Sequence, residues 1–263
     1  MTPHRFMIAA ICTMISGYCS LASAQLATTL VYGDDIIVPS YVANAVASSK
    51  RPLADKERDA NRLPDKVMTF FGVEPGDKVA ELLTSSGYYS AVLSGIVGDN
   101  GKVYGHNNQW LLDRRPEGSP LLKRIADYGL TNIEEVIAEL EETGLPKGEM
   151  DAVFMVLIYH DAVGLFETDV AKMNRAVYDS LKPGGVYGII DHHAAPGAGR
   201  SATVTNHRIE RHVVVDQITS VGFELAAESD LLENLDDPLN SSVFAPGIRG
   251  NTHRMLLKFK KPD

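Results

Sequence analysis

Val79-Ala-Glu-Leu-Leu-Thr-Ser-Ser-Gly-Tyr-Tyr-Ser90 predicts a strand, a tight turn and the start of a helix. The preceding Val73-Glu-Pro-Gly-Asp77 has proline and glycine at the centre of a turn, so the apolar run 78–83 is expected to be a short buried strand. The helix is expected over residues 88–97. Such a junction presents unpaired backbone N–H groups, which suit a carboxylate or a ribose-bearing ligand, although ordinary strand-turn-helix connections share the pattern.

Continuous apolar runs alternate with amphipathic segments along the rest of the chain. Strands are expected over residues 78–83, 101–106, 133–138, 152–159, 185–191, 223–228 and 254–260, and helices over 88–97, 119–128, 168–181 and 208–221. Strands that are apolar throughout are typical of a parallel sheet covered on both faces. The sequence therefore predicts an α/β fold: a single Rossmann-like, doubly wound, mostly parallel seven-stranded sheet with helices on both faces and an antiparallel edge strand.

The first 24 residues have the pattern of a signal peptide. Arg5 is followed by a mostly apolar run over residues 6–18 and by Ala22-Ser-Ala24, a small-residue cleavage signal. We expect cleavage after Ala24 and export to the periplasm. Both cysteines, Cys12 and Cys19, lie in this segment, so the mature chain would contain no disulfide. Lipidation at Cys19 is the alternative.

Composition narrows the range of partners. The chain of 263 residues carries a formal net charge of −9, which argues against nucleic acid or an anionic membrane surface. No later apolar run approaches the ~20 residues of a membrane-spanning helix, so stable membrane insertion is not expected. We expect an N-terminal helical extension over residues 25–72, an α/β domain over residues 73–263 and a small-molecule substrate. The sequence indicates no oligomeric state.

Several phrases resemble class I S-adenosylmethionine-dependent methyltransferases. Leu181-Lys-Pro-Gly-Gly-Val-Tyr-Gly188 resembles the turn into their fifth strand, and the segments 101–105 and 151–157 resemble their second and fourth strands. The chain after the signal peptide also resembles a family of exported bacterial proteins described as predicted methyltransferases. The phrases that carry this resemblance are Phe70-Phe-Gly-Val-Glu-Pro-Gly76, Tyr159-His-Asp161, Asp191-His-His-Ala-Ala-Pro-Gly-Ala-Gly199, His207-Arg-Ile-Glu210 and Ile248-Arg-Gly-Asn-Thr-His-Arg254.

The resemblance implies methyl transfer with S-adenosyl-L-methionine as cofactor, and it implies a cofactor site around the first turn. Glu81 would help to hold the loop and the amino group of the cofactor. The loop residues Thr84, Ser86 and Gly87 would lie against its methionine portion. Tyr88, which opens the following helix, would pack on the ligand.

Two further positions are implied, and three depart from the pattern of the superfamily. Asn107 stands where an acidic residue accepts hydrogen bonds from the ribose hydroxyls, and Glu141 matches the acidic residue beside the adenine amino group. Leu83 and Ser85 replace loop glycines, and Asn107 replaces a carboxylate. A β-carbon at a position that needs positive φ costs roughly 1–2 kcal/mol unless the loop changes conformation. Replacing a charge-assisted hydrogen bond with a neutral one costs about 1 kcal/mol.

Candidate catalytic residues lie at the ends of two neighbouring strands. Tyr159, His160 and Asp161 end one strand, and Asp191 and His192 end the next. Because open α/β sheets bind ligands at the carboxyl ends of their strands, we expect His160 and His192 to face one cleft. A carboxylate would orient an imidazole there as general base.

Two other interpretations stay open. The donors of His160, Asp161, Asp191, His192 and His207 are of the types that zinc and iron prefer, so a metal site competes for the same cluster, although no spacing motif supports it. The methyltransferase interpretation assigns no metal ligand. The other alternative is a non-catalytic protein that uses the same fold to bind a different ligand.

Overall fold

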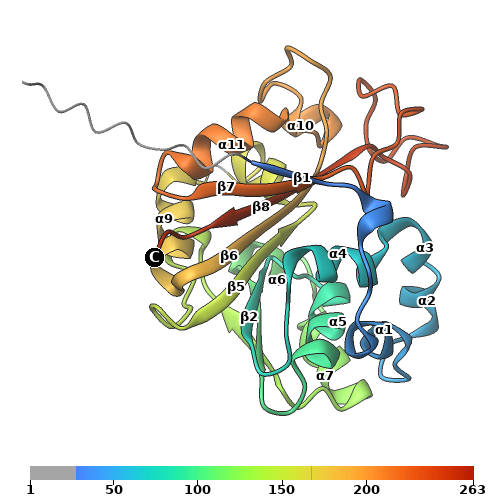
Figure 1. The fold of residues 1–263 in the computed structure, drawn as a ribbon, viewed down its shortest axis with the longest axis vertical. Coiled ribbons are helices and arrows are strands. Elements are labelled where there is room, and N and C mark those ends of the chain that lie inside the picture. The colour runs from blue at the N-terminus through green and yellow to red at the C-terminus, as the bar shows by residue number, and fades with distance from the viewer. Residues whose placement is uncertain (1–27, 167) are drawn as a thin grey trace, which may run out of the picture.

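An eight-stranded sheet with the order β1-β7-β8-β6-β5-β2-β3-β4 runs through the molecule (Figure 1). The computed structural model describes residues 28–166 and 168–263, so the signal peptide predicted at residues 1–24 lies outside the described residues. The strands are β1 (Thr29–Val31), β2 (Lys78–Leu82), β3 (Lys102–Asn107), β4 (Ile133–Ile137), β5 (Met150–Val156), β6 (Leu181–His192), β7 (Glu224–Ser229) and β8 (Arg254–Lys260). β8 is antiparallel to β6 and β7, whereas the other neighbouring strands are parallel. The expected doubly wound, mostly parallel α/β fold is confirmed.

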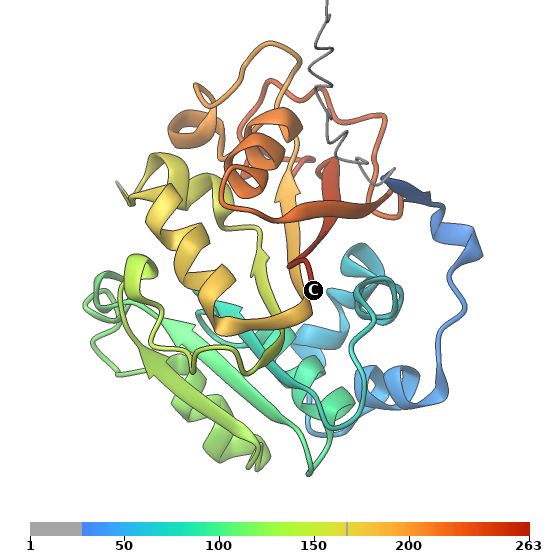
Figure 2. The same cartoon turned by 60° about the vertical axis from the view of Figure 1, so that its left-hand side comes forward.

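Helices cover both faces of this sheet. They are α1 (Ser40–Ala47), α2 (Leu53–Lys56), α3 (Asp59–Arg62), α4 (Pro64–Phe71), α5 (Tyr88–Val97), α6 (Gln109–Leu112), α7 (Pro120–Tyr128), α8 (Tyr159–Gly164), α9 (Val170–Ser180), α10 (Thr203–Asn206) and α11 (Arg211–Thr219), with 3-10 turns η1 (Gly33–Asp35) and η2 (Leu140–Glu142). Figure 2 shows α9 and α11 on one side of the central strands and the blue and cyan N-terminal helices on the other. Among the described residues, no helix is both long and apolar enough to span a membrane.

Alternate side chains of each strand point to opposite faces, which gives the molecule two cores. In β5, Phe154 packs in the core under α1, α4 and α5, whereas Val153 and Met155 pack in the core under α8, α9 and α11. All three side chains are fully buried. Burial on both faces explains why this strand is apolar throughout and why it was predicted from the sequence.

The segment before β2 is docked against the sheet at two places. β1 pairs in parallel with β7, with Thr29 opposite Ala227. α1 packs on α5, where a β-carbon at Gly95 would lie only 2.8 Å from that of Ala45, so glycine is needed for this close approach. The extension therefore contributes a strand as well as helices, and the sheet has eight strands instead of the seven expected.

The limits of most elements agree with expectation, and two differ in ways that affect the site. α5 and β8 have the limits predicted from the sequence. Tyr159 begins α8 instead of ending a strand, because Leu157, with a φ of 57°, turns the chain after β5. His207 follows α10 in a left-handed conformation, with a φ of 54°, and does not open the next helix.

Candidate active site

The turn after β2 has positive φ angles at both positions where the resemblance places glycines that this chain lacks. Leu83 and Ser85 have φ angles of 51° and 55°, and Gly87 has a φ of 75°. A side chain in this left-handed region costs roughly 1–2 kcal/mol per residue, so the loop is strained at two positions. Leu83 and Ser85 therefore take backbone angles that glycine adopts more easily.

Buried polar side chains hold the loop in place. The carboxylate of Glu81 accepts 2.6 Å hydrogen bonds from the hydroxyl groups of Thr84 and Ser90. Burial raises the pKa of Glu81, against the effect of these hydrogen bonds. Glu81 thus lies in contact with the loop, as the resemblance implied, and its contact with a cofactor amino group stays a prediction.

Asn107 supports the same loop from the neighbouring strand. Its Oδ1 accepts a 2.9 Å hydrogen bond from the backbone N–H of Ser85, and its Nδ2 donates to Glu135 at 3.0 Å. The side chain has no exposed surface. The structure therefore turns this amide toward Ser85 instead of toward a ribose in the cavity.

Tyr88 is directed toward the N-terminal helices instead of the cavity. Its hydroxyl group donates to Asp59 at 2.5 Å, and the guanidinium group of Arg62 lies 4.7 Å from its ring centroid. Asp59 also forms a two-point ion pair with the fully buried side chain of Arg51. Tyr88 therefore anchors the N-terminal segment, which differs from the expected packing on a ligand.

Glu141 lies beside a small cavity of about 300 Å³ that follows β3 and β4. Its carboxylate accepts a 2.9 Å hydrogen bond from the backbone N–H of Asp169. Trp110 and Phe166 also line this cavity and pack edge to face, with ring centroids 4.9 Å apart. Aromatic rings next to a carboxylate suit a flat base that carries an amino group.

The larger cavity, of about 820 Å³, opens at the carboxyl ends of β2, β5 and β6. Ser85 and Ser86 of the loop line it together with His160 and His192. The histidines therefore share one cavity with the loop, at the edge of the sheet where a ligand was expected. Two segments that are far apart in the sequence also line it: Glu57, Arg58, Asn61 and Arg62 from the N-terminal helices, and Val243, Phe244, Arg249, Gly250, Thr252 and Arg254 from the segment before and into β8.

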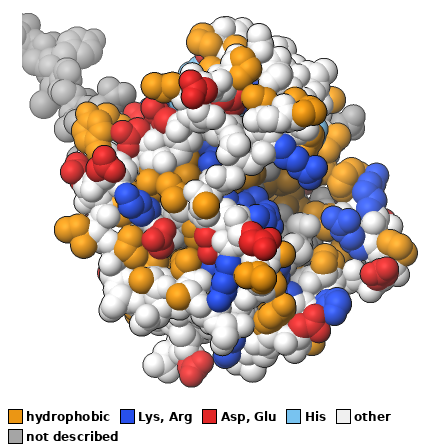
Figure 3. All heavy atoms as spheres, turned by 90° about the vertical axis from the view of Figure 1, so that its right-hand side faces the viewer, with side chains coloured by type: hydrophobic (Ala, Val, Ile, Leu, Met, Phe, Trp, Pro, Cys, Tyr) orange, Lys and Arg blue, Asp and Glu red, His pale blue; other side chains and the backbone are white. Residues whose placement is uncertain are grey.

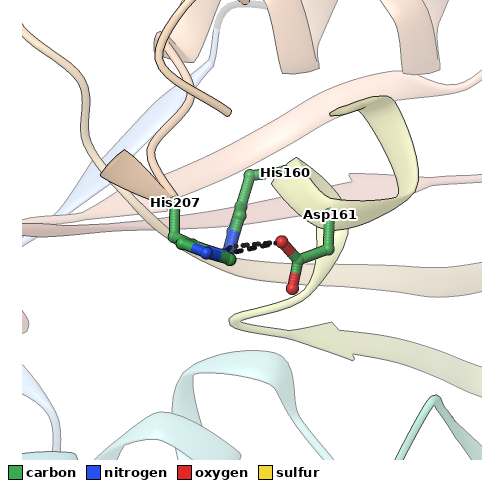
Figure 4. Close-up of side chains that lie close together, drawn as sticks. All are labelled: His160, Asp161 and His207. Carbon is green, nitrogen blue, oxygen red and sulfur yellow. Dashed lines mark hydrogen bonds and ion pairs between the residues drawn. The ribbon is translucent and has the colours of Figure 1, made fainter. Parts of the chain in front are cut away.

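Three side chains meet in the wall of this cavity (Figure 4). Oδ1 of Asp161 lies 3.1 Å from Nε2 of His160 and 2.9 Å from Nδ1 of His207. The two ring nitrogens are 3.3 Å apart. Asp191, fully buried at the end of β6, places its Oδ1 2.7 Å from Nδ1 of His160. The His160 ring is thus held between two carboxylates.

The two histidines of the cavity differ in their preferred charge. Burial alone would lower the pKa of His160, but Asp191 and Asp161 outweigh it and raise the pKa to about 10. Burial, reinforced by His160 and Arg254, lowers the pKa of His192 well below its ordinary value. The carboxylates therefore favour the charged form of His160, whereas burial favours the neutral form of His192, which suits His192 to accept a proton. Nδ1 of His192 lies 2.7 Å from the hydroxyl oxygen of Thr252.

Tyr159 lies in the core instead of the cavity. Its hydroxyl group donates to Gln217 of α11 at 3.2 Å and accepts from Asn174 of α9 at 2.9 Å. The side chain is fully buried, and burial raises its pKa. The start of α8 therefore directs Tyr159 into the helix layer and leaves His160 and Asp161 at the cavity.

Cationic side chains gather around the cavity. Figure 3 shows this face of the molecule hollowed, with Lys and Arg side chains around the hollow. Within residues 28–166 and 168–263, Arg62, Arg115, Arg249 and Arg254 form no ion pair with a carboxylate, although all four line the cavity. Arg254 is only 8% exposed, and its guanidinium group donates to the backbone oxygens of Asn61 and Thr252. Arg254, which is buried without a counter-charge, favours an anionic ligand.

Sequence reasoning missed part of this site. It considered His207 only as a metal donor, whereas the structure places it in contact with Asp161. It overlooked Arg58 and Arg62, because they belong to the helical extension and not to the ends of the strands. Their four-residue spacing, which can place two side chains on one side of a helix, was the available signal.

Comparison with solved structures shows which class of fold this is. No protein-family model and no curated protein matches the chain. A methyltransferase of Aquifex aeolicus that depends on S-adenosylmethionine is 21% identical with a TM-score of 0.56, over 80% of this chain and 98% of that chain. An arsenic(III) S-adenosylmethionine methyltransferase of Chlamydomonas reinhardtii is 18% identical with a TM-score of 0.56, over 86% of this chain and 75% of that chain. The cyclase SpnF is 15% identical with a TM-score of 0.56, over 84% of this chain and 91% of that chain. The protein therefore has the class I methyltransferase fold, which proteins of different named activities share.

Proposed function

We propose that this protein is an S-adenosylmethionine-dependent methyltransferase that acts on an anionic small molecule. The observation that carries the proposal is the loop at residues 83–87. It has positive φ angles at Leu83, Ser85 and Gly87, and through Ser85 and Ser86 it lines the same cavity as His160 and His192. Strain of this kind persists where the surrounding structure enforces it, and it is often found at functional sites.

The described residues fit the parts of this cofactor. The backbone at Ser86, at the start of α5, would take its methionine portion, whereas the N–H of Ser85 is bonded to Asn107 and holds the loop. Trp110 and Glu141 would take its adenine portion in the smaller cavity. When bound, S-adenosylmethionine would supply an electrophilic methyl group, whose bond to sulfur breaks as the acceptor nucleophile bonds to the methyl carbon. His192, kept neutral by its surroundings, would take up the proton that the acceptor loses.

The acceptor that fits this cavity is anionic. Arg62 and Arg254 enter it from opposite ends of the chain, and neither has a carboxylate partner among the described residues. A carboxylate or phosphate on the acceptor would compensate these charges and fix its orientation. Positioning of this kind is the main requirement of an in-line transfer.

Export to the periplasm is a further part of the proposal. It is supported by Arg5, the apolar run over residues 6–18 and Ala22-Ser-Ala24. The test is N-terminal sequencing of the protein recovered from the periplasmic fraction, where we expect Gln25 as the first residue. A sequence that begins at Met1, or recovery only from the cytoplasm, would contradict export without affecting the proposed activity.

Calorimetric titration with S-adenosylmethionine, and then with S-adenosylhomocysteine, tests the proposed activity. We expect saturable one-to-one binding of both. Asn107→Ala should weaken binding about tenfold, because it leaves the N–H of Ser85 without its partner and loosens the loop. Asn132→Ala is the matched control: its amide also donates to backbone oxygens, of Ser94 and Gly98, but at the opposite end of the sheet, so affinity should not change.

A binding protein for another ligand is the second candidate. The buried position of the Asn107 amide favours it, because that side chain offers nothing to a ribose in the cavity. In that case neither cofactor would release heat, and a different anionic metabolite would raise the unfolding temperature.

A further inference from the structure

We propose that Nε2 of His160, Nδ1 of His207 and a carboxylate oxygen of Asp161 bind a divalent transition-metal ion of the zinc or ferrous-iron class. Two imidazoles and one carboxylate are a common ligand set for such ions, and an open side leaves positions for a ligand oxygen or water. This site lies in the wall of the larger cavity. Among the described residues, no other group of three side chains brings such donor atoms together.

The spacing of the three donor atoms matches one face of a coordination sphere. They form a triangle with sides of 2.9 Å, 3.1 Å and 3.3 Å. A metal about 2.1 Å from each donor separates neighbouring ligand atoms by about 3.0 Å in octahedral geometry and about 3.4 Å in tetrahedral geometry. The observed sides fall between or just below these values, so a metal can bind with little movement of the side chains.

A cluster in which both ring nitrogens carry a hydrogen is crowded. Nδ1 of His160 already interacts with Asp191, so Nε2 is the atom that faces Asp161 and His207. Two ring N–H groups directed at Oδ1 of Asp161 would bring their hydrogens close together, since the nitrogens are only 3.3 Å apart. A cation placed beside the triangle uses the lone pairs of all three atoms at once.

Asp191 provides the support that metal-binding histidines usually have. Its Oδ1 accepts from Nδ1 of His160 at 2.7 Å, which leaves the Nε2 lone pair for a metal. Asp191 is itself fixed by the backbone N–H groups of His160 at 2.8 Å and His192 at 2.7 Å. A carboxylate behind a ligating histidine fixes the ring orientation and increases its basicity.

The site combines a rigid side with an accessible one. His160 is 2% exposed, whereas the side chains of Asp161 and His207 are 13% and 22% exposed and face the cavity. Phe244 packs edge to face on the His207 ring, with centroids 4.9 Å apart, and limits its rotation. His192 is not part of the ligand set, because its Nδ1 contacts Thr252 and its ring centroid lies 5.8 Å from that of His160.

Zinc titration of the purified, tag-free protein after treatment with a chelator tests this inference. We expect one zinc ion per chain, and the same titration with ferrous iron under anaerobic conditions identifies which ion binds more tightly. His207→Asn should weaken binding of the preferred ion at least tenfold, and asparagine tolerates the left-handed backbone of position 207. His212→Asn is the matched control, because His212 is 58% exposed and lies outside the triangle.

Asp191→Asn tests the metal site without changing any of the three proposed ligands. It keeps the shape of the side chain but changes the support of His160, so metal affinity should fall by about 10- to 100-fold. A thermal melt shows whether each variant is folded. The inference is overturned if the wild-type protein binds neither ion, or if His207→Asn and the wild type bind equally well. Because the readout is metal content, the result does not depend on whether S-adenosylmethionine binds.

Discussion

Two buried histidines show how the two halves of the cavity differ. His106, on β3 behind the loop, is fully buried and accepts a hydrogen bond from the backbone N–H of Leu83 at 3.4 Å. Burial lowers the pKa of His106 to about 4. His160 is buried almost as deeply, yet Asp191 and Asp161 overcome the effect of burial and raise its pKa to about 10.

The different pKa values of His106 and His160 distinguish a side of the cavity that supports the loop from a side that carries reactive groups. On the loop side, Glu81, Thr84, Ser90, Ser85 and Asn107 are joined by hydrogen bonds and the pKa of His106 is lowered, so this half acts as a fixed frame. On the strand-end side, the carboxylates of Asp161 and Asp191 converge on the rings of His160 and His207 in the wall of the cavity. The same residue type, at similar burial, therefore has a different role according to whether a carboxylate lies beside it.

The largest effect on stability is expected where a charged pair is buried, at Arg208 and Asp237. Both side chains are fully buried, and two 2.9 Å hydrogen bonds join them. Arg208→Ala should lower the free energy of unfolding by about 3–5 kcal/mol, because Asp237 would remain buried without its partner. Urea unfolding measures this.

Arg211→Ala is the control for that variant. Arg211 pairs with Glu228 at the surface, where the side chains are 36% and 30% exposed, so the loss should be below about 1 kcal/mol. Equal losses of unfolding free energy in the two variants would show that breaking the buried Arg208–Asp237 pair costs no more than breaking a surface pair.

On the loop side, His106 should make the stability of the protein sensitive to acid. Its folded pKa of about 4 lies below the unfolded value of 6.5, so between these values the unfolded chain binds the proton and the native chain does not. Stability is therefore retained above pH 6.5 and falls as pH drops toward 4, by about 3 kcal/mol.

Urea unfolding at pH 7 and pH 4 measures this sensitivity. His106→Gln should remove about 3 kcal/mol of the difference in unfolding free energy between the two pH values, whatever its effect at pH 7. His212→Asn, at the surface, should leave the difference as it is. An unchanged pH dependence in His106→Gln would mean that His106 is not kept neutral.

Asn107→Asp tests directly whether this side chain belongs to the frame or to the ligand site. In the frame, a carboxylate loses the hydrogen bond to Glu135 and places two acids together, so we expect a loss of about 1–3 kcal/mol in unfolding free energy and no gain in S-adenosylmethionine affinity. Asn44→Asp is the control, because Asn44 is exposed on α1 and lines neither cavity, so the same charge is added away from both. Tighter cofactor binding by Asn107→Asp would instead place residue 107 at the ribose.

The smallest effect is expected where the loop is strained. Ser85→Gly removes roughly 1–2 kcal/mol of backbone strain and gives up roughly 0.5–1 kcal/mol of chain entropy, so unfolding free energy should rise by about 1 kcal/mol or less. Ser86→Gly is the control: position 86 is not among the positive-φ residues, so the same change there should destabilise. Urea midpoints compare the two, and a decrease in both would argue against strain at position 85.

Local patterns account for the parts of the fold that were predicted. The limits of α5 and β8 follow from apolar spacing and flanking turns, which are properties of neighbouring residues. Tyr159 was misplaced because an apolar run does not show where a buried strand becomes a buried helix, and only the backbone angle of Leu157 marks that point. β1 was missed because its three residues gain their order from β7, far along the chain.

Interactions across the molecule explain what was missed at the site. His160 and Asp161 were expected at the cavity because strand ends converge. The role of Asn107 depends on Glu135 and Ser85, and that of His207 on Asp161, none of which is a neighbour in sequence.

The two facing walls of the larger cavity come from segments far apart in the sequence, and this determines when the cavity can form. One wall is the helical segment that carries Arg62, and the facing wall is the segment that leads into β8, where Arg254 bonds to Asn61 across 193 residues of chain. Contacts between such distant residues form late, because a long loop must close first. The cavity therefore forms only once the chain has been made through Arg254, at the same stage at which β8 can enter the sheet between β7 and β6.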